Sequence, residues 1–84
     1  MTTTREQIAA TIDEILSGKG AAPRPLQDGD TLVAGLGFDS LDLAVLVVKL
    51  EQRLDCDPFR DGRSAVATFG ELVAVYEEAR GGDA

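Results

Sequence analysis

Apolar residues recur every three or four positions in three separate stretches of the chain, residues 4–17, 40–55 and 69–80. This spacing places them on one side of an α-helix, so each stretch is predicted to form an amphipathic helix that buries that side. No segment shows the alternation of apolar and polar residues that a half-buried strand requires, and the chain contains no internal repeat. The pattern therefore predicts an all-α fold.

The ends of these stretches carry residues that start and stop helices. Thr3 with Glu6, and Thr68 with Glu71, have the spacing of a capping box, in which each side chain accepts a hydrogen bond from the backbone amide of the other residue. Asp39 is a favourable N-cap for the middle helix. Glycines follow the first and the last stretch, as is common after helix ends. These signals indicate three main helices.

Residues 18–38 form a long linker rich in glycine, proline and aspartate. A linker of this length without regular structure is unusual in a compact domain, so its apolar residues are expected to hold it over the open side of a helical bundle. They are Leu26, Leu32, Val33, Leu36 and Phe38. Farther along, Asp57 and Pro58 suit the start of a short fourth helix over residues 58–64. The predicted architecture is a small four-helix bundle with three main helices and one short helix.

The middle helix has two apolar faces rather than one. The face expected to pack in the core contains Leu43, Leu46, Val47, Leu50 and Leu54, opposite the polar Asp42, Lys49, Gln52 and Arg53. A second stripe lies on the flank that follows Ser40 and contains Leu41, Ala44, Val45 and Val48. In a small domain the linker could bury this stripe. We favour the alternative, in which the stripe is a docking surface for partner proteins.

Composition limits the classes of function. The 84 residues provide one domain, spanning residues 1–84. Fifteen acidic residues against eight basic ones give a net charge of −7, which disfavours nucleic acid and anionic membrane surfaces as partners. We expect no apolar leader or membrane segment, and the single cysteine, Cys56, cannot form an internal disulfide. We therefore expect a soluble cytoplasmic protein that is a monomer.

Ser40 is the candidate functional residue. Its hydroxyl stands at the start of the middle helix, after the turn-forming Gly37. The chain contains no histidine, which is the usual base for a nucleophilic serine, so chemistry at Ser40 must be carried out by another protein. The acidic residues lack the spacing of a calcium loop, and we expect no metal site. The sequence thus predicts a non-catalytic protein whose serine receives a group.

The segment Gly37–Leu41 reads Gly-Phe-Asp-Ser-Leu. It resembles the attachment motif of the acyl and peptidyl carrier protein family. The resemblance extends over nearly the whole chain, because the order of capped first helix, long linker, second helix, short third helix and final helix is similar to the family's layout. The position of Asp-Ser-Leu within this layout makes the resemblance specific.

The resemblance implies a covalent cofactor and a set of partner enzymes. A phosphopantetheinyl transferase would move 4′-phosphopantetheine from coenzyme A onto Ser40, and Asp39 would help to position magnesium and coenzyme A in that complex. The thiol of the arm would carry acyl or aminoacyl groups as thioesters, from the enzymes that load them to downstream biosynthetic enzymes. By the same resemblance, Leu41, Val45 and Val48 match positions that partner enzymes contact.

Departures from the fatty-acid type of carrier narrow this expectation. That type usually has a glutamate in place of Val45 and acidic residues in place of Lys49 and Gln52. Their absence favours apolar recognition, which resembles carriers of specialised pathways that make polyketides or nonribosomal peptides or that activate single amino acids. We therefore expect a free-standing carrier of such a pathway. The alternatives are a carrier of fatty-acid synthesis, or an unmodified helical adaptor that binds partner helices through the second stripe.

Overall fold

The computed structural model describes residues 3–22, 25–59 and 66–81, and it contains three α-helices in these ranges. They are α1 (Thr4–Gly18), α2 (Ser40–Leu54) and α3 (Phe69–Ala79). Each helix boundary lies within one residue of the sequence prediction. Apart from one isolated β-bridge, this part of the chain contains no strand, so the all-α prediction is confirmed.

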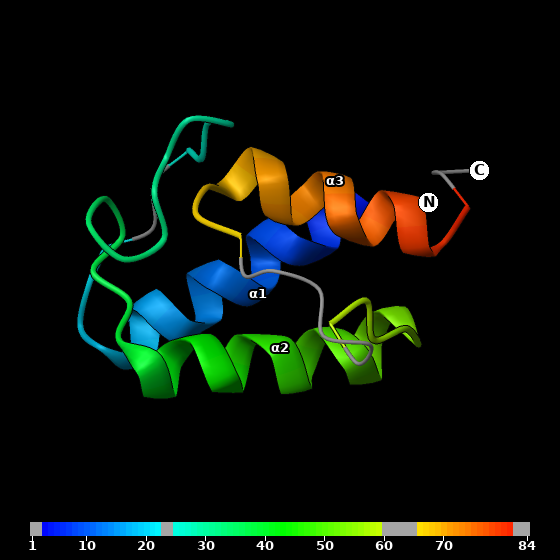
Figure 1. Cartoon of the computed structure of the whole chain (residues 1–84). Coiled ribbons are helices and arrows are strands. Elements are labelled where there is room, and N and C mark those ends of the chain that lie inside the picture. The colour runs from blue at the N-terminus through cyan, green and yellow to red at the C-terminus, as the bar shows by residue number, and fades with distance from the viewer. Residues whose placement is uncertain (1–2, 23–24, 60–65, 82–84) are drawn as a thin grey trace.

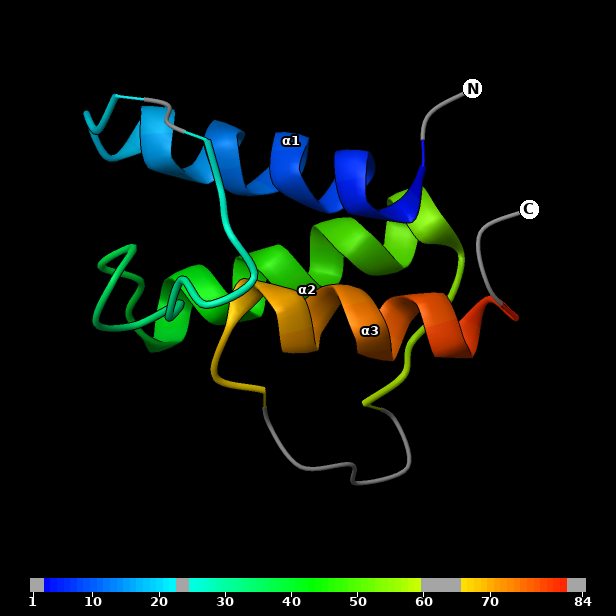
Figure 2. The same cartoon turned by 90° about the horizontal axis from the view of Figure 1, so that it is seen from above.

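Helix α1 packs against both other helices (Figure 1). Figure 2 shows that α2 and α3 run in the same direction, opposite to α1, and that the linker between α1 and α2 lies at the end of the bundle where α2 and α3 begin. At the other end, Arg80 Nη1 donates a hydrogen bond to Thr4 Oγ1 at 2.6 Å, which joins the end of α3 to the start of α1. None of the helices in the described ranges is long and apolar enough to cross a membrane.

Each helix begins at a complete capping box. Two of the boxes are those predicted at Thr3 with Glu6 and at Thr68 with Glu71. In each, the threonine hydroxyl accepts from the glutamate amide, and the glutamate carboxylate accepts from the threonine amide. Hydrogen bonds from the amides of Ala67 and Thr68 also hold the pKa of Glu71 below its ordinary value. An N-cap of this kind contributes about 1 kcal/mol to helix stability.

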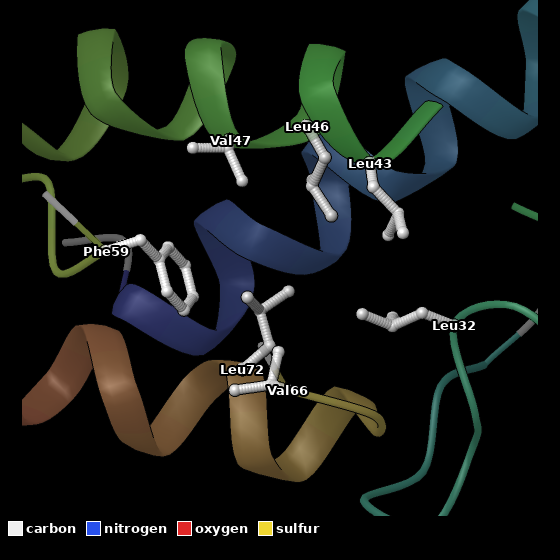
Figure 3. A pocket seen from close by; sticks show the side chains of 7 residues that line it. All are labelled: Leu32, Leu43, Leu46, Val47, Phe59, Val66 and Leu72. Atoms are coloured by element: carbon white, nitrogen blue, oxygen red, sulfur yellow. The ribbon is translucent and has the colours of Figure 1, made fainter. Parts of the chain in front are cut away.

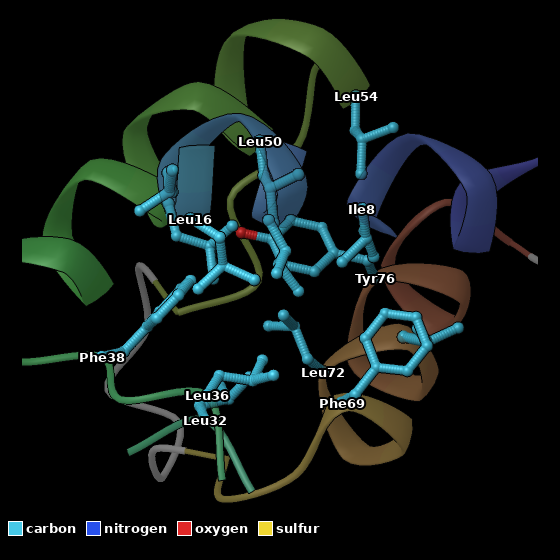
Figure 4. Close-up of a cluster of buried hydrophobic side chains, with 14 residues drawn as sticks. Ile8, Leu16, Leu32, Leu36, Phe38, Leu50, Leu54, Phe69, Leu72 and Tyr76 are labelled. Atoms are coloured by element: carbon cyan, nitrogen blue, oxygen red, sulfur yellow. The ribbon is translucent and has the colours of Figure 1, made fainter. Parts of the chain in front are cut away.

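Within the described residues, fourteen buried apolar side chains form one core between the helices and the linker (Figure 4). From the linker, Leu32, Leu36 and Phe38 are buried, and Leu26 is partly buried against the same core. These four residues hold the linker against the bundle, as the sequence predicts. A linker anchored in this way loses much of the freedom that a solvated loop would keep.

Val33 does not join the core, and the prediction that it does was wrong. Residues 31–36 fold into a helical turn, in which Gly35 N donates to Thr31 O at 3.1 Å. Leu32 and Leu36 lie four positions apart and therefore share the inner side of this turn. Val33 follows Leu32 directly and points outward, so that 60% of its surface is exposed.

Backbone hydrogen bonds fasten the linker to the start of α3. Phe69 N donates to Asp30 O at 2.8 Å, and Gly70 N donates to Asp28 O at 3.0 Å. Arg5 reinforces the contact from α1, because it pairs with Asp28 at 2.6 Å while its guanidinium lies 5.4 Å from the centre of the Phe69 ring. A Cβ atom on Gly70 would lie 2.7 Å from Asp28 Cβ. The close approach of linker and helix therefore requires a glycine at this position.

The predicted fourth helix over residues 58–64 is not confirmed. Asp57 Oδ1 accepts from Phe59 N at 3.3 Å, as at a helix start, but Pro58 and Phe59 form a turn rather than a helix. The rest of the predicted helix, residues 60–64, lies outside the described residues. The described chain therefore supports a bundle of three helices completed by the linker.

Replacing Gly70 with alanine is expected to lower the free energy of unfolding by about 1–3 kcal/mol, the usual cost of overpacking. The added Cβ would also lie 3.0 Å from Asp28 O, a backbone atom that is already hydrogen-bonded to Gly70 N. Gly18→Ala is the control, because nothing lies within 4 Å of the Cβ it would add. Chemical denaturation compares the two variants, and unchanged stability of Gly70→Ala would contradict the close approach.

Candidate functional site

Ser40, the predicted attachment residue, is the first residue of α2 and is exposed. We call residues 37–40 the attachment turn. Gly37 has a φ angle of +76°, a left-handed conformation that other residues rarely adopt. The side chain of Phe38 points into the core, where it is 1% exposed (Figure 4). The turn therefore holds Ser40 at the surface, two positions after a buried anchor.

The start of α2 is capped from both directions. Asp39 is the N-cap that the sequence predicts, and its Oδ1 accepts from Asp42 N at 2.8 Å. Asp42 Oδ2 accepts from Asp39 N at 3.0 Å in return. The first intrahelical bond is made by Leu43 N to Asp39 O, so the amides of Ser40 and Leu41 precede it and point toward the helix end. Such amides and the positive end of the helix dipole suit a phosphate ester on the serine, so the site fits a phosphodiester.

Lys19, which follows α1 as its C-cap, belongs to this site and was missed by sequence reasoning. Its Nζ donates to Gly37 O at 2.8 Å and to the Asp42 carboxylate, and it lies 6.0 Å from the centre of the Phe38 ring. The hydrogen bond from Lys19, followed by the one from the amide of Asp39, holds the pKa of Asp42 below its ordinary value. No local pattern reveals this contact, because Lys19 and Gly37 are 18 positions apart and meet only in the folded chain.

The second apolar stripe of α2 is open to solvent in the part of the chain that the structure describes. The exposed fraction is 71% for Leu41, 37% for Val45 and 53% for Val48, and Ala44 is exposed as well. Burial of the stripe by the linker was the alternative that the sequence left open, and these exposed fractions contradict it. The stripe begins directly after Ser40, so a protein that reaches this serine would meet it.

A cavity of about 220 Å³ lies on the inner side of α2. Of the residues that the structure describes, seven apolar ones line it, and their side chains point toward one another in Figure 3. They include Leu43 and Val47 of α2, Leu32 of the linker and Leu72 of α3. The sequence predicts Leu43 and Val47 as core residues, and both are only half-buried because they line this space. Because the described side chains that line the cavity are all apolar, it suits a hydrocarbon group better than water.

The Cys56 thiol and the Tyr76 hydroxyl, two further groups that could react, are made less reactive by their surroundings. Burial raises the pKa of the Cys56 thiol, which lowers the fraction of reactive thiolate. The Tyr76 hydroxyl is buried without a hydrogen-bond partner in the described chain, and burial raises its pKa far above the ordinary value. The described residues also contain no group of three or more His, Cys, Asp or Glu side chains that could hold a metal ion. Ser40 is therefore the best candidate for chemistry on this protein.

Comparison with known proteins identifies the family. The family described as "Phosphopantetheine attachment site" matches residues 6–60. The acyl carrier protein of Sulfurovum sp. (strain NBC37-1) is 34% identical over 56 residues, which cover 67% of this chain and 75% of that protein. Acyl carrier proteins of Rhodopseudomonas palustris strains BisB18 and HaA2 are each 30% identical over 59 residues, which cover 70% of this chain and 75% of those proteins. No solved structure matches the chain.

These similarities agree with the architecture described above. The family match spans more than half of the chain and includes α2 with the attachment turn. Each of these relatives is covered over three quarters of its length. The chain therefore belongs to the acyl carrier protein family, whose phosphopantetheine attachment domain carries 4′-phosphopantetheine as a covalent cofactor.

Proposed function

We propose that Ser40 is the attachment residue and that a phosphopantetheinyl transferase modifies it in the cytoplasm. The observation that carries this proposal is the position of the serine, which is exposed, opens α2 and follows a turn fixed by Gly37 and the buried Phe38. The chain has no histidine to act as a base. The transferase must therefore supply the group that removes the hydroxyl proton.

In the proposed reaction, Ser40 Oγ forms a bond to the phosphorus of coenzyme A that carries the pantetheine arm. The bond from this phosphorus to the bridging oxygen of the diphosphate breaks, and adenosine 3′,5′-bisphosphate leaves. The hydroxyl proton passes to the base of the transferase. The product is a phosphodiester at the N-terminal end of α2, where the first amides and the helix dipole stabilise its negative charge.

Asp39 is proposed to help position magnesium and coenzyme A in the transferase complex. Its exposed carboxylate lies next to Ser40 and is held by the hydrogen bond from Asp42 N. Carboxylate oxygens are typical magnesium ligands, and magnesium commonly binds one or two carboxylates together with substrate phosphates. The ion would thus belong to the complex and leave with it.

The exposed stripe Leu41, Ala44, Val45 and Val48 is proposed to dock the transferase and the enzymes that load or receive the cargo. Burying the side chains of Leu41, Val45 and Val48, which are 37–71% exposed, would favour association. Lys49 and Gln52 lie beside Ala44, Val45 and Val48 in a shallow depression, where the fatty-acid type of carrier usually has acidic residues. We therefore favour carriage of acyl or aminoacyl thioesters in a polyketide or nonribosomal peptide type of pathway over fatty-acid synthesis.

The apolar cavity is proposed to receive the apolar part of the cargo. Leu43 lines it and lies three positions after Ser40, so the cavity and the attachment residue share the first turn of α2. The described side chains on its walls are all apolar, which suits a hydrocarbon segment rather than a polar one. Cargo held there would be shielded from water while the carrier moves between enzymes.

The exposed stripe would also suit an unmodified adaptor that binds a partner helix. An adaptor needs the stripe but makes no use of a hydroxyl at Ser40. Modification of Ser40 therefore separates the two functions directly.

Incubating the purified chain with coenzyme A, magnesium and a broad-specificity phosphopantetheinyl transferase is expected to raise its intact mass by one phosphopantetheine arm. Ser40→Ala, which should fold equally well because Ser40 is exposed, is expected to show no gain. Mass spectrometry of the intact protein gives the result. No gain in the folded parent chain would contradict the carrier function and favour the adaptor.

Val48→Glu is expected to change the free energy of unfolding by less than about 0.5 kcal/mol, as exposed substitutions usually do. It should raise the KM of the transferase for the chain about tenfold, because it places a charge in an apolar contact. Leu50→Glu is the contrasting variant, since Leu50 is 0% exposed and a charge there should unfold the protein. Circular dichroism and transferase kinetics measure the two effects, and unfolding of Val48→Glu would show that the stripe is core.

Apolar recognition predicts that binding to the transferase depends weakly on salt. The dissociation constant of the chain with the transferase is expected to change less than about threefold between about 50 and 300 mM sodium chloride, since screening weakens contacts between exposed charges and not apolar ones. Isothermal titration calorimetry at several salt concentrations measures this dependence. A steep loss of affinity over the range would indicate charge pairing and favour the fatty-acid type of carrier.

A further inference from the structure

Lys19, the C-cap residue of α1, makes three contacts around the attachment turn. Lys19 Nζ donates to Gly37 O at 2.8 Å, pairs with the Asp42 carboxylate and lies 6.0 Å from the centre of the Phe38 ring. Gly37 and Phe38 precede Ser40 in the chain, and Asp42 follows it. Lys19 thus joins the two sides of the turn that presents the serine.

Each contact fixes a different part of the turn. Gly37 has the left-handed φ angle, and the bond to its carbonyl oxygen fixes the peptide group that follows it. Asp42 accepts from Asp39 N as well as from Lys19, both through Oδ2, so the ammonium group holds this carboxylate in its capping position. Hydrogen bonds in which both partners are charged are among the stronger ones in proteins. Together they leave the backbone on either side of Ser40 little freedom.

A second ion pair, between Arg53 of α2 and Glu14 of α1, serves as a structural comparison for the contacts of Lys19. At the far end of α2, Arg53 Nη2 donates to Glu14 Oε1 at 2.8 Å, and Arg53 Nη1 donates to Thr11 Oγ1 at 2.9 Å. This pair joins α1 to the last turn of α2, at the end of α2 opposite to Ser40 (Figure 1). It therefore supplies a matched comparison for Lys19.

We infer that Lys19 is a positioning residue for the transfer of phosphopantetheine to Ser40. It does not touch the reacting atoms, and it acts through Gly37 and Asp42 by keeping the serine hydroxyl in one orientation. A reacting group that is held in place reacts faster than one that samples many orientations. The inference rests on the proposed function, because it concerns the modification of Ser40.

The ammonium group of Lys19 also lies beside the turn that would carry the negatively charged phosphodiester. Asp39 and Asp42 already place two carboxylates in the first turn of α2, and the phosphodiester on Ser40 adds a further negative charge beside them. Within the described residues, Lys19 is the basic side chain that contacts this turn. Its charge offsets part of the repulsion as the phosphodiester forms.

The test is steady-state kinetics of the transferase with the full apo-chain and its variants. Lys19→Met keeps a long side chain and removes the charge, and it is expected to lower kcat about tenfold, the size of effect that loss of hydrogen bonds from a charged group produces. The KM for the chain should change less than about twofold, because the exposed stripe that binds the transferase is intact. Lys19→Arg, which restores a cation and its donors, is expected to recover most of kcat.

Arg53→Met controls for the loss of an ion pair between α1 and α2. It should lower stability by a similar small amount and leave both kinetic constants unchanged, and circular dichroism confirms that every variant is folded. Equal kcat values for Lys19→Met and the parent would overturn the inference while the proposed function stands. A rise in KM with unchanged kcat would also overturn it, because Lys19 would then be a contact of the transferase. Failure of the parent itself to be modified would overturn the proposed function, and the inference with it.

Discussion

The burial of Phe38 is the contact on which the attachment turn depends. A fully buried side chain of this size contributes about 1.5–3 kcal/mol, and here it fixes the backbone directly before the cap of α2. Leu32 and Leu36 provide two further anchors in the same linker. A long linker without them would sample many paths between α1 and α2, at a large cost in conformational entropy when it is ordered. Because the anchors are buried and Ser40 is not, the serine is both exposed and fixed.

Most of the fold could be predicted because its signals are local. The caps at Thr3 and Thr68 involve partners three residues away, so both members of each pair can be read from the sequence. Val33 was assigned wrongly because the direction of a side chain in the linker depends on the turn that the linker makes, and apolarity alone does not indicate that turn. The cavity could not be predicted either. Leu43 and Val47 satisfy the pattern of a core face whether the space beside them is filled or open.

The parts of the site that lie within one helix could also be predicted. Rotation by 100° per residue separates the faces of α2, so the stripe that begins at Leu41 is visible in the sequence, although its exposure had to come from the structure. Asp42 completes a capping box with aspartates at both positions, which a search limited to threonine or serine with glutamate overlooks. No local sequence pattern indicated that Lys19 contacts the site. Its contacts depend on how the end of α1 meets the linker, and that meeting is a property of the tertiary fold.

A protein that carries thioesters must keep its own thiols from taking the cargo. Cys56, the chain's single cysteine, is half-buried just after the end of α2. Burial raises the pKa of its thiol, and the charges of Asp55 and Asp57 raise it further against the opposing effect of Arg80. These effects lower the fraction of thiolate, which is the form that attacks an acyl group. In the carrier function proposed above, this environment disfavours transfer of the cargo from the thiol of the arm to Cys56.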